Sequence, residues 1–191
     1  YYYSTLDSTM DTVFRLGLDG AAEGATVLSE SQRKGRGRFR REWSSPRYKG
    51  LYFSFLLRPA ISPAEAAKLT LAFSVGCCRA ISVAAGIRSE VKWPNDILIG
   101  RRKVCGILTE LNSGPDAVRF VVVGIGLNVN TAAADLPEGA TSLAAAAGRI
   151  LDRTVLLRLM LTELETVYLD FCRNGFSLIR EEWRKACPLL G

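Results

Sequence analysis

The apolar pattern and the helix boundary signals along the chain together predict five helices. Apolar side chains that recur every three or four residues form a stripe on one helix face. The expected helices run from about residue 8 to 20, then over 62–85, 142–150 and 154–173, with a final turn or two around 177–185. The stripes of the first and fourth helices are Met10, Val13, Phe14 and Leu18, and Leu156, Met160, Leu164, Val167 and Phe171.

Start and stop residues support two of these helices. Asp7 or Ser8 can cap the first helix, and Gly20 ends it. The segment Ser62-Pro63-Ala64-Glu65 combines a capping serine, a proline at the first position and the glutamate of a capping box, and Gly86 suits the C-terminal end. Residues 69–86 of this helix are apolar, but Arg79 near the middle favours a core helix over a membrane span.

Apolar runs bounded by turn residues predict six strands. They are residues 25–29, 51–57, 90–93, 97–99, 103–111 and 119–129. Pro94 breaks the strand 90–93, and the turns Gly100-Arg101-Arg102 and Asn112-Ser113-Gly114-Pro115 separate the strands that follow, so the last four strands are expected to form an antiparallel meander. With no repeat and no long linker, the order of elements predicts one α+β domain over residues 1–191, in which helices pack on a mixed, mostly antiparallel sheet.

Residues 31–43 fit neither the helical spacing nor the alternation of a strand, and they are predicted to form a basic loop. Six basic side chains lie within the nine residues 33–41, with two glycines among them and Trp43 just beyond. Dense like charges repel, so we expect the loop to stay mobile until an anion binds. Arginine forks and glycine N–H groups suit carboxylate and phosphate oxygens. A solvated basic loop, or one that contacts nucleic acid phosphates, is the alternative.

Composition narrows the chemistry. The net charge of +6 favours anionic ligands or partners, and the complete absence of histidine excludes Ser-His-Asp triads, histidine zinc sites and imidazole catalysis. The five cysteines form no CxxC pair, which is typical of buried free thiols in a reducing compartment. With no signal peptide at its start, the chain is expected to be cytoplasmic and not bound to a membrane.

Two further stretches can carry chemistry. In Lys92-Trp93-Pro94-Asn95-Asp96, a strand presents the lysine and the proline ends it, so the amide and carboxylate lie in the turn that follows. Lysine can face a phosphate, and Asn and Asp can hold Mg²⁺ or hydroxyls, although an ordinary turn has the same composition. Glycines at 106, 124 and 126 weaken strands unless something approaches the backbone there. They form no dinucleotide fingerprint and no Walker loop.

Together these stretches resemble the pattern and order of biotin protein ligases. The resemblance covers about residues 4–185 and implies the biotin/lipoate ligase-like catalytic fold, which is similar to class II aminoacyl-tRNA synthetases. The matching motifs are Gly35-Arg36-Gly37-Arg38, Trp43, Lys92-Trp93-Pro94-Asn95-Asp96, Lys103-Val104-Cys105-Gly106-Ile107-Leu108-Thr109-Glu110 and Gly124-Ile125-Gly126-Leu127-Asn128.

The resemblance implies a reaction in two half-steps. The carboxylate of biotin attacks the α-phosphate of Mg-ATP to form biotinyl-5'-AMP and pyrophosphate. A lysine on a biotin carboxyl carrier domain, of acetyl-CoA carboxylase or a similar enzyme, then takes the biotinyl group and AMP leaves. Positioning and charge neutralisation dominate such chemistry, and a basic site without histidine can supply both.

The resemblance also implies roles for individual residues. The polar contacts to the ureido ring of biotin are expected from Ser8, Thr9, Gln32 and the backbone at Gly35 and Arg36. The carboxylate and phosphates are expected to meet Arg36, Arg38 and Lys103, while Gly106 and Gly124 leave room for the valeryl chain. Trp43 is expected to cover the adenine with Asn128 at the purine edge, and Lys92, Asn95 and Asp96 to flank the reacting phosphate and Mg²⁺. Lys92, Arg38 and Lys103 are the expected catalytic residues. For Ser8, helix capping is the alternative.

Three departures from the family pattern qualify these expectations. Arg40 stands where the loop GRGRxGRxW has its last glycine, which costs about 1 kcal/mol if the position needs a positive φ. Met10 stands where many relatives have Asn. The chain ends at Gly191, where the family continues into a small SH3-like β domain, and it shows no N-terminal helix-turn-helix domain, so no DNA binding is expected.

The alternatives are a weakened biotin-binding relative, a lipoate or octanoate ligase, and a nucleic-acid-binding module. A homodimer is possible in the family.

Overall fold

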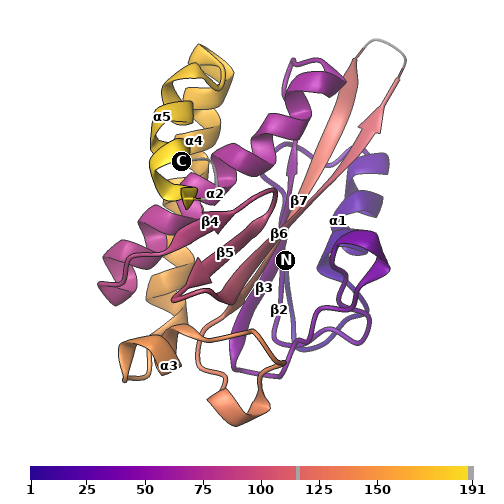
Figure 1. Cartoon of the computed structure of the whole chain (residues 1–191). Helices are drawn as coiled ribbons and strands as arrows, with labels where there is room; N and C mark the ends of the chain where they lie inside the picture. The colour runs from indigo at the N-terminus through magenta and orange to yellow at the C-terminus, as the bar shows by residue number, and fades with distance from the viewer. Residues whose placement is uncertain (115–116, 189–191) are drawn as a thin grey trace.

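The computed structural model describes residues 1–114 and 117–188, with the side chain of Arg40 left out. This part folds into a seven-stranded sheet that carries α-helices on both faces (Figure 1). The strand order is β1-β2-β3-β7-β6-β5-β4, and β1 with β2 is the one parallel pair in it. The strands are β1 (Tyr2–Tyr3), β2 (Thr26–Ser29), β3 (Gly50–Leu57), β4 (Glu90–Lys92), β5 (Asp96–Ile99), β6 (Arg102–Ser113) and β7 (Val118–Asn128).

The helices are α1 (Thr9–Leu18), α2 (Pro63–Ala85), α3 (Leu143–Ala147), α4 (Arg153–Asn174) and α5 (Ser177–Ala186). Two short 3₁₀ turns, η1 (Arg38–Arg40) and η2 (Ala133–Asp135), lie in the loops. The α+β class, the mostly antiparallel sheet and the meander β4 to β7 are confirmed. The expected third helix is shorter than 142–150, because Gly148 adopts a left-handed conformation (φ 67°) and ends it.

The larger core lies between the sheet and the helices α2, α4 and α5 (Figure 1). Side chains alternate between the two faces of a strand, so the odd-numbered residues of β3 and β7, such as Phe53 and Val123, point into this core. By length and composition α2 could cross a membrane, yet 56% of its most apolar window is buried in the protein, and Gly76 lets α4 approach closely. The expectation of a core helix is confirmed.

The predicted capping of α2 is also confirmed. Ser62 accepts a hydrogen bond from the N–H of Glu65, whose side chain returns to the backbone of Ser62, and Gly86 ends the helix with φ 70°. In α1, Ser8 occupies the N-cap position but its hydroxyl makes no cap hydrogen bond. The expectation of a cap at Ser8 or Asp7 is therefore confirmed for the position of Ser8, and only the side-chain hydrogen bond that usually accompanies a serine cap is missing.

The opposite face of the sheet positions the site. The single helix α1 covers only part of it, around Phe120, Val122 and Leu56. Further along the same face of β7, Gly124 lies against Met10 of α1, whereas Gly126 is covered by Trp43 from the chain between β2 and β3. That chain contains the basic loop of residues 31–43.

Smaller expectations have mixed outcomes. The strand β1 was not expected from two exposed tyrosines. All five cysteines are free, as expected, but burial is confirmed only for Cys77, Cys105 and Cys187, because Cys78 is half-buried and Cys172 is exposed. Asn112 and Ser113, which were expected to begin a turn, lie in β6 instead, and Pro115 of that turn lies outside the described residues.

Candidate active site

The basic loop forms a small hairpin that folds over the glycine-rich face of the sheet. The N–H of Trp43 donates to the carbonyl of Gly35 (2.9 Å), and the N–H of Gly37 donates to that of Arg41 (2.7 Å). A Cβ added at Gly35 would lie 2.4 Å from the carbonyl oxygen of Trp43, so this close crossing requires glycine. The left-handed residue at the hairpin tip is Phe39 (φ 55°), just before Arg40, whose side chain lies outside the described part.

Three of the basic side chains that the structure describes in this loop are paired with carboxylates. Arg33 (2.7 Å) and Lys34 (3.0 Å) contact Asp7, and the hydrogen bond from Arg33 holds the pKa of Asp7 below its ordinary value. Arg36 lies 2.7 Å from Asp11 in α1 and 2.8 Å from Glu110 in β6. These pairs offset much of the repulsion that the sequence suggests for this loop.

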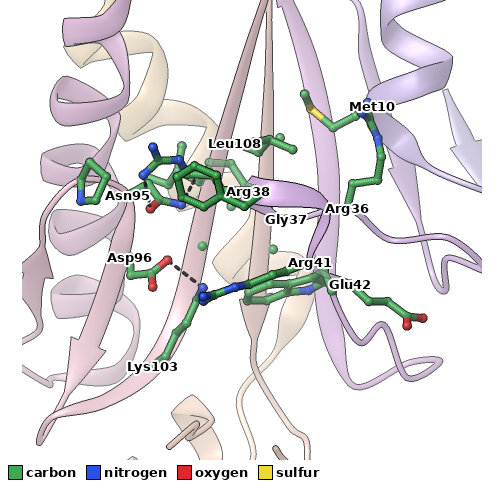
Figure 2. Close-up of a pocket in the computed structure, with 18 of the residues that line it drawn as sticks. Met10, Arg36, Gly37, Arg38, Arg41, Glu42, Asn95, Asp96, Lys103 and Leu108 are labelled. Carbon is green, nitrogen blue, oxygen red and sulfur yellow. Dashed lines mark hydrogen bonds and ion pairs between the residues drawn. The ribbon is translucent and has the colours of Figure 1, made fainter.

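The two arginines expected to hold the biotin carboxylate lie differently. Arg36 turns toward α1 beside Met10 (Figure 2), and its guanidinium pairs with Asp11 and Glu110. Arg38 reaches across the cavity, where its Nη1 donates to Oδ1 of Asn95 (3.3 Å). The basic loop and the Lys92–Asp96 turn, far apart in sequence, therefore meet through Arg38.

The cavity beneath the hairpin has a volume of about 320 Å³. Its polar end is built around Gln32, whose Oε1 accepts hydrogen bonds from the backbone N–H (2.9 Å) and the hydroxyl (3.1 Å) of Thr9. Gln32 donates through Nε2 to Ser45 Oγ (3.0 Å), and the Thr9 hydroxyl also contacts Ser54 Oγ (2.8 Å). The hydroxyl of Ser8 beside them is buried, with no hydrogen-bond partner among the described residues.

Three glycines on the floor of the cavity leave room that is filled by the side chains of Trp43 and Met10. A Cβ at Gly126 would lie 2.4 Å from Trp43 Cε2, and one at Gly106 would lie 2.9 Å from Trp43 Cζ3. A Cβ at Gly124 would lie 2.5 Å from the sulfur of Met10. Gly106 and Gly124 were expected to leave room for the substrate chain; in this structure Trp43 and Met10 pack there, and a contact with substrate stays a prediction.

A β-bulge turns Lys103 toward the site. Leu98 pairs with Lys103 but Ile97 pairs with Cys105, so Val104 is the extra residue. Because one extra residue reverses the alternation of side chains, Lys103 shares a face with Gly106. Its ammonium lies 2.7 Å from Oδ1 of Asp96 (Figure 2), in an ion pair that lacks the geometry of a regular hydrogen bond, and 5.2 Å from the centre of the Trp43 ring.

A second cavity of about 320 Å³ adjoins the first. Both are lined by Glu42, Trp43, Lys92, Asp96 and Lys103. Asn128 lines the second one, and its Nδ2 donates to the carbonyl of Thr141 (3.0 Å). The far wall is the segment 131–140, held to β6 where the N–H of Lys103 donates to Gly139 O (2.8 Å).

Asp96 is the candidate metal ligand. Among residues 1–114 and 117–188, no group of three or more His, Cys, Asp or Glu side chains is placed to hold an ion. Mg²⁺ is commonly bound by one or two carboxylates together with substrate phosphates, so a single aspartate fits it. The Lys103 ammonium now occupies one oxygen of Asp96, which leaves the other for a metal.

The structure thus brings Thr9, Gln32, Arg36, Arg38, Trp43, Lys92, Asn95, Asp96, Lys103, Gly106 and Gly124 around one cavity, and Asn128 beside it. Gly35 lies at the close crossing of the hairpin, and Ser8 precedes the lining residue Thr9, but neither Gly35 nor Ser8 lines the cavity itself. Sequence reasoning missed Ser45 and Ser54. A serine within the apolar run 51–57 was the available signal for Ser54. It also missed the 131–140 wall, for which the sequence shows no motif.

Comparison with known proteins gives a consistent result. The family model "Biotin/lipoate A/B protein ligase family" matches residues 1–128. The chain is 41% identical over 186 residues to the bifunctional ligase/repressor BirA of Bacillus subtilis, covering 95% of this chain and 57% of that protein. It is 33% identical to the biotin–[acetyl-CoA-carboxylase] ligase of Paracoccus denitrificans, covering 97% of this chain and 79% of the relative.

Solved structures agree with the sequence relatives. The biotin protein ligase of Aquifex aeolicus in complex with biotin and ATP superimposes with a TM-score of 0.84 at 30% identity, over 98% of this chain and 77% of that one. The chain thus spans little more than half of the Bacillus relative and about three quarters of the Aquifex structure.

Proposed function

Because the chain belongs to the biotin/lipoate A/B protein ligase family, we propose that it activates biotin with ATP and transfers the biotinyl group to a protein lysine. The observation that carries the proposal is the pair of adjoining cavities with a shared charged wall. An acid in the first cavity and a nucleotide in the second would place carboxylate and α-phosphate against the same lysines. Holding two reactants in this way supplies much of the rate of such a reaction.

In the first half-reaction a carboxylate oxygen of biotin bonds to the α-phosphorus of ATP. The bond from that phosphorus to the oxygen bridging to the β-phosphate breaks, and pyrophosphate leaves with the electron pair. Lys103 and Lys92 line both cavities, so their ammonium groups can neutralise the charge that gathers between the reactants. Arg38, which lines the first cavity and donates to Asn95, adds a planar cation.

Binding of the two substrates falls to different residues. We assign the polar ring of biotin to Thr9 and Gln32, supported by Ser54 and by the unpaired hydroxyl of Ser8. The indole of Trp43 lines both cavities and can cover the adenine, with Asn128 at its edge. Asp96 would hold Mg²⁺, which neutralises phosphate charge when it is bound.

In the second half-reaction the amine of an acceptor lysine attacks the carbonyl carbon of biotinyl-5'-AMP. An amide forms, the C–O bond to AMP breaks, and the amine loses a proton. The acceptor we propose is a biotin carboxyl carrier domain, in line with the name of the Paracoccus relative. A cytoplasmic location, a possible homodimer and the lack of DNA binding stay predictions.

The experiment that tests the proposal is mass spectrometry after incubation of the protein with biotin and Mg-ATP. We expect biotinyl-5'-AMP and released pyrophosphate, then a mass gain on an added carrier domain. Lys103→Gln should lower the rate of adenylate formation by about 10²-fold, as expected for loss of a group that stabilises developing charge. Lys34→Gln is the matched control, because Lys34 pairs with Asp7 and lines neither cavity.

Parallel reactions separate the alternatives. Adenylate formed with lipoate or octanoate but not with biotin would assign the lipoate-type activity instead. Bound biotin without any adenylate would identify a weakened biotin-binding relative. Steep salt-dependent binding to DNA or RNA, with no response to biotin, would favour a nucleic-acid-binding module. The ion pairs of Arg33, Lys34 and Arg36 with carboxylates disfavour that function, because they reduce the positive charge available for phosphates.

A further inference from the structure

The turn between β5 and β6 places an arginine where glycine is favoured. Ile99 pairs with Arg102, so Gly100 and Arg101 are the two turn residues, with φ of 54° and 66°. Two consecutive residues with positive φ are typical of a type I′ hairpin turn, which selects Gly, Asn or Asp. An arginine here is strained in its backbone, and such strain persists where the side chain has a use.

The side chain of Arg101 lies at the second cavity. Arg101 is among its lining residues together with Lys92 and Lys103, whereas the next residue, Arg102, is not. Within residues 1–114 and 117–188, the guanidinium of Arg101 makes no ion pair below 4.0 Å, and it is exposed. The strained turn therefore presents an uncommitted cation to the cavity.

The two walls of this cavity carry different charges. The wall from β4 to β6 holds Lys92, Arg101 and Lys103, with Asp96 already paired to Lys103. The opposite wall, in the segment 131–140, holds Asp135 and Glu138. A polyphosphate between these walls would be attracted to the strands, where arginine offers the planar fork that matches phosphate oxygens.

We propose that Arg101 binds the polyphosphate of ATP beyond the α-phosphate. The proposal rests on the function proposed above and adds a nucleotide-binding residue that none of the sequence motifs contains. It explains why the left-handed turn position carries arginine instead of glycine. The contact is made to the β- or γ-phosphate, so it holds ATP and pyrophosphate but not AMP.

Calorimetric titration of Arg101→Gly with ATP, pyrophosphate and AMP tests the proposal. Glycine suits the turn, so the variant should fold with an unchanged or higher melting temperature. The affinities for ATP and for pyrophosphate should fall about tenfold, as for loss of one charged hydrogen bond at an exposed site, while AMP is unaffected. Arg102→Ala, which removes the same charge one residue away, should leave all three affinities unchanged.

Several results would overturn the proposal. Equal ATP affinity in Arg101→Gly and Arg102→Ala would mean that the cation acts only through net charge or not at all. An equal loss of affinity for ATP and AMP, reproduced by Glu138→Gln, would mean that Arg101 contacts Glu138 in the segment 131–140 and not the phosphates. A wild-type protein that binds no ATP would sink the proposed function as well, whereas adenylate formation with unchanged Arg101→Gly affinities would sink this inference alone.

Discussion

A methyl group added at Gly126 should displace the ring of Trp43 while costing the fold little stability. In Gly126→Ala the new Cβ would lie 2.4 Å from Cε2 and 2.6 Å from Nε1 of Trp43. Ordinary contacts between non-bonded heavy atoms lie at about 3.5–4.0 Å, so the ring must retreat from the strand by about 1 Å. It can do so because it borders the cavity rather than the packed core.

The expected effect on stability is small and the effect on activity is large. Overpacking costs about 1–3 kcal/mol in a rigid core, and a movable ring places this change near the lower end, or about 2–4 °C in melting temperature for a chain of this size. A displacement of about 1 Å at a reacting centre can lower the rate by about 10²-fold. Trp43 lines both cavities, so its retreat disturbs both substrates.

The assay is the initial rate of pyrophosphate release with biotin and Mg-ATP, measured together with the thermal midpoint. Gly114→Ala is the matched control, because the nearest atom to its added Cβ among the described residues lies 4.0 Å away. In a Trp43→Phe background the smaller ring should remove most of the stability cost of Gly126→Ala, which a double-mutant cycle would detect. A Gly126→Ala protein with a rate within about threefold of wild type would refute the view that β7 sets the position of the indole.

Three further changes probe other parts of the molecule. Met10→Ala removes the thioether packed on Gly124 and should cost about 2 kcal/mol, while raising the rate of adenylate formation for biotin analogues with an enlarged ring relative to biotin; an unchanged preference in competition assays would contradict this. Ser8→Ala should leave the melting temperature unchanged or higher, because its hydroxyl caps nothing, yet raise the KM for biotin; a loss of about 1 kcal/mol would instead indicate capping. The hydrogen bond from Arg79 lowers the pKa of Glu182, so this pair stabilises the fold above the ordinary carboxyl pKa of about 4.3 and the contribution is lost as pH falls through the lower folded value. Glu182→Gln should therefore destabilise the protein by roughly 0.5–1 kcal/mol at pH 7, and a gap in melting temperature that persists unchanged at acidic pH would contradict the assignment.

Local signals along the chain predict most of the elements. The capping box at Ser62 needs only four consecutive residues, and it predicts the start of α2 correctly. The meander from β4 to β7 follows from apolar runs and turn residues that are adjacent in sequence. The motifs around Arg38, Asp96 and Lys103 were likewise sufficient to predict the family, since their order along the chain carries that information.

The direction of individual side chains depended on contacts between distant segments. Arg36 and Arg38 occupy equivalent places in the sequence Gly-Arg-Gly-Arg, but Asp11 and Glu110 hold the first at the rim while Asn95 meets the second across the cavity. The bulge at Val104 turns Lys103 to the site face, and this is set by pairing between β5 and β6. Charge, periodicity and motif order are properties of neighbouring residues, so they were enough to predict the family and most of the elements, but not β1. Which groups face one another across the cavities was decided by the packing of strands and loops far apart in the chain.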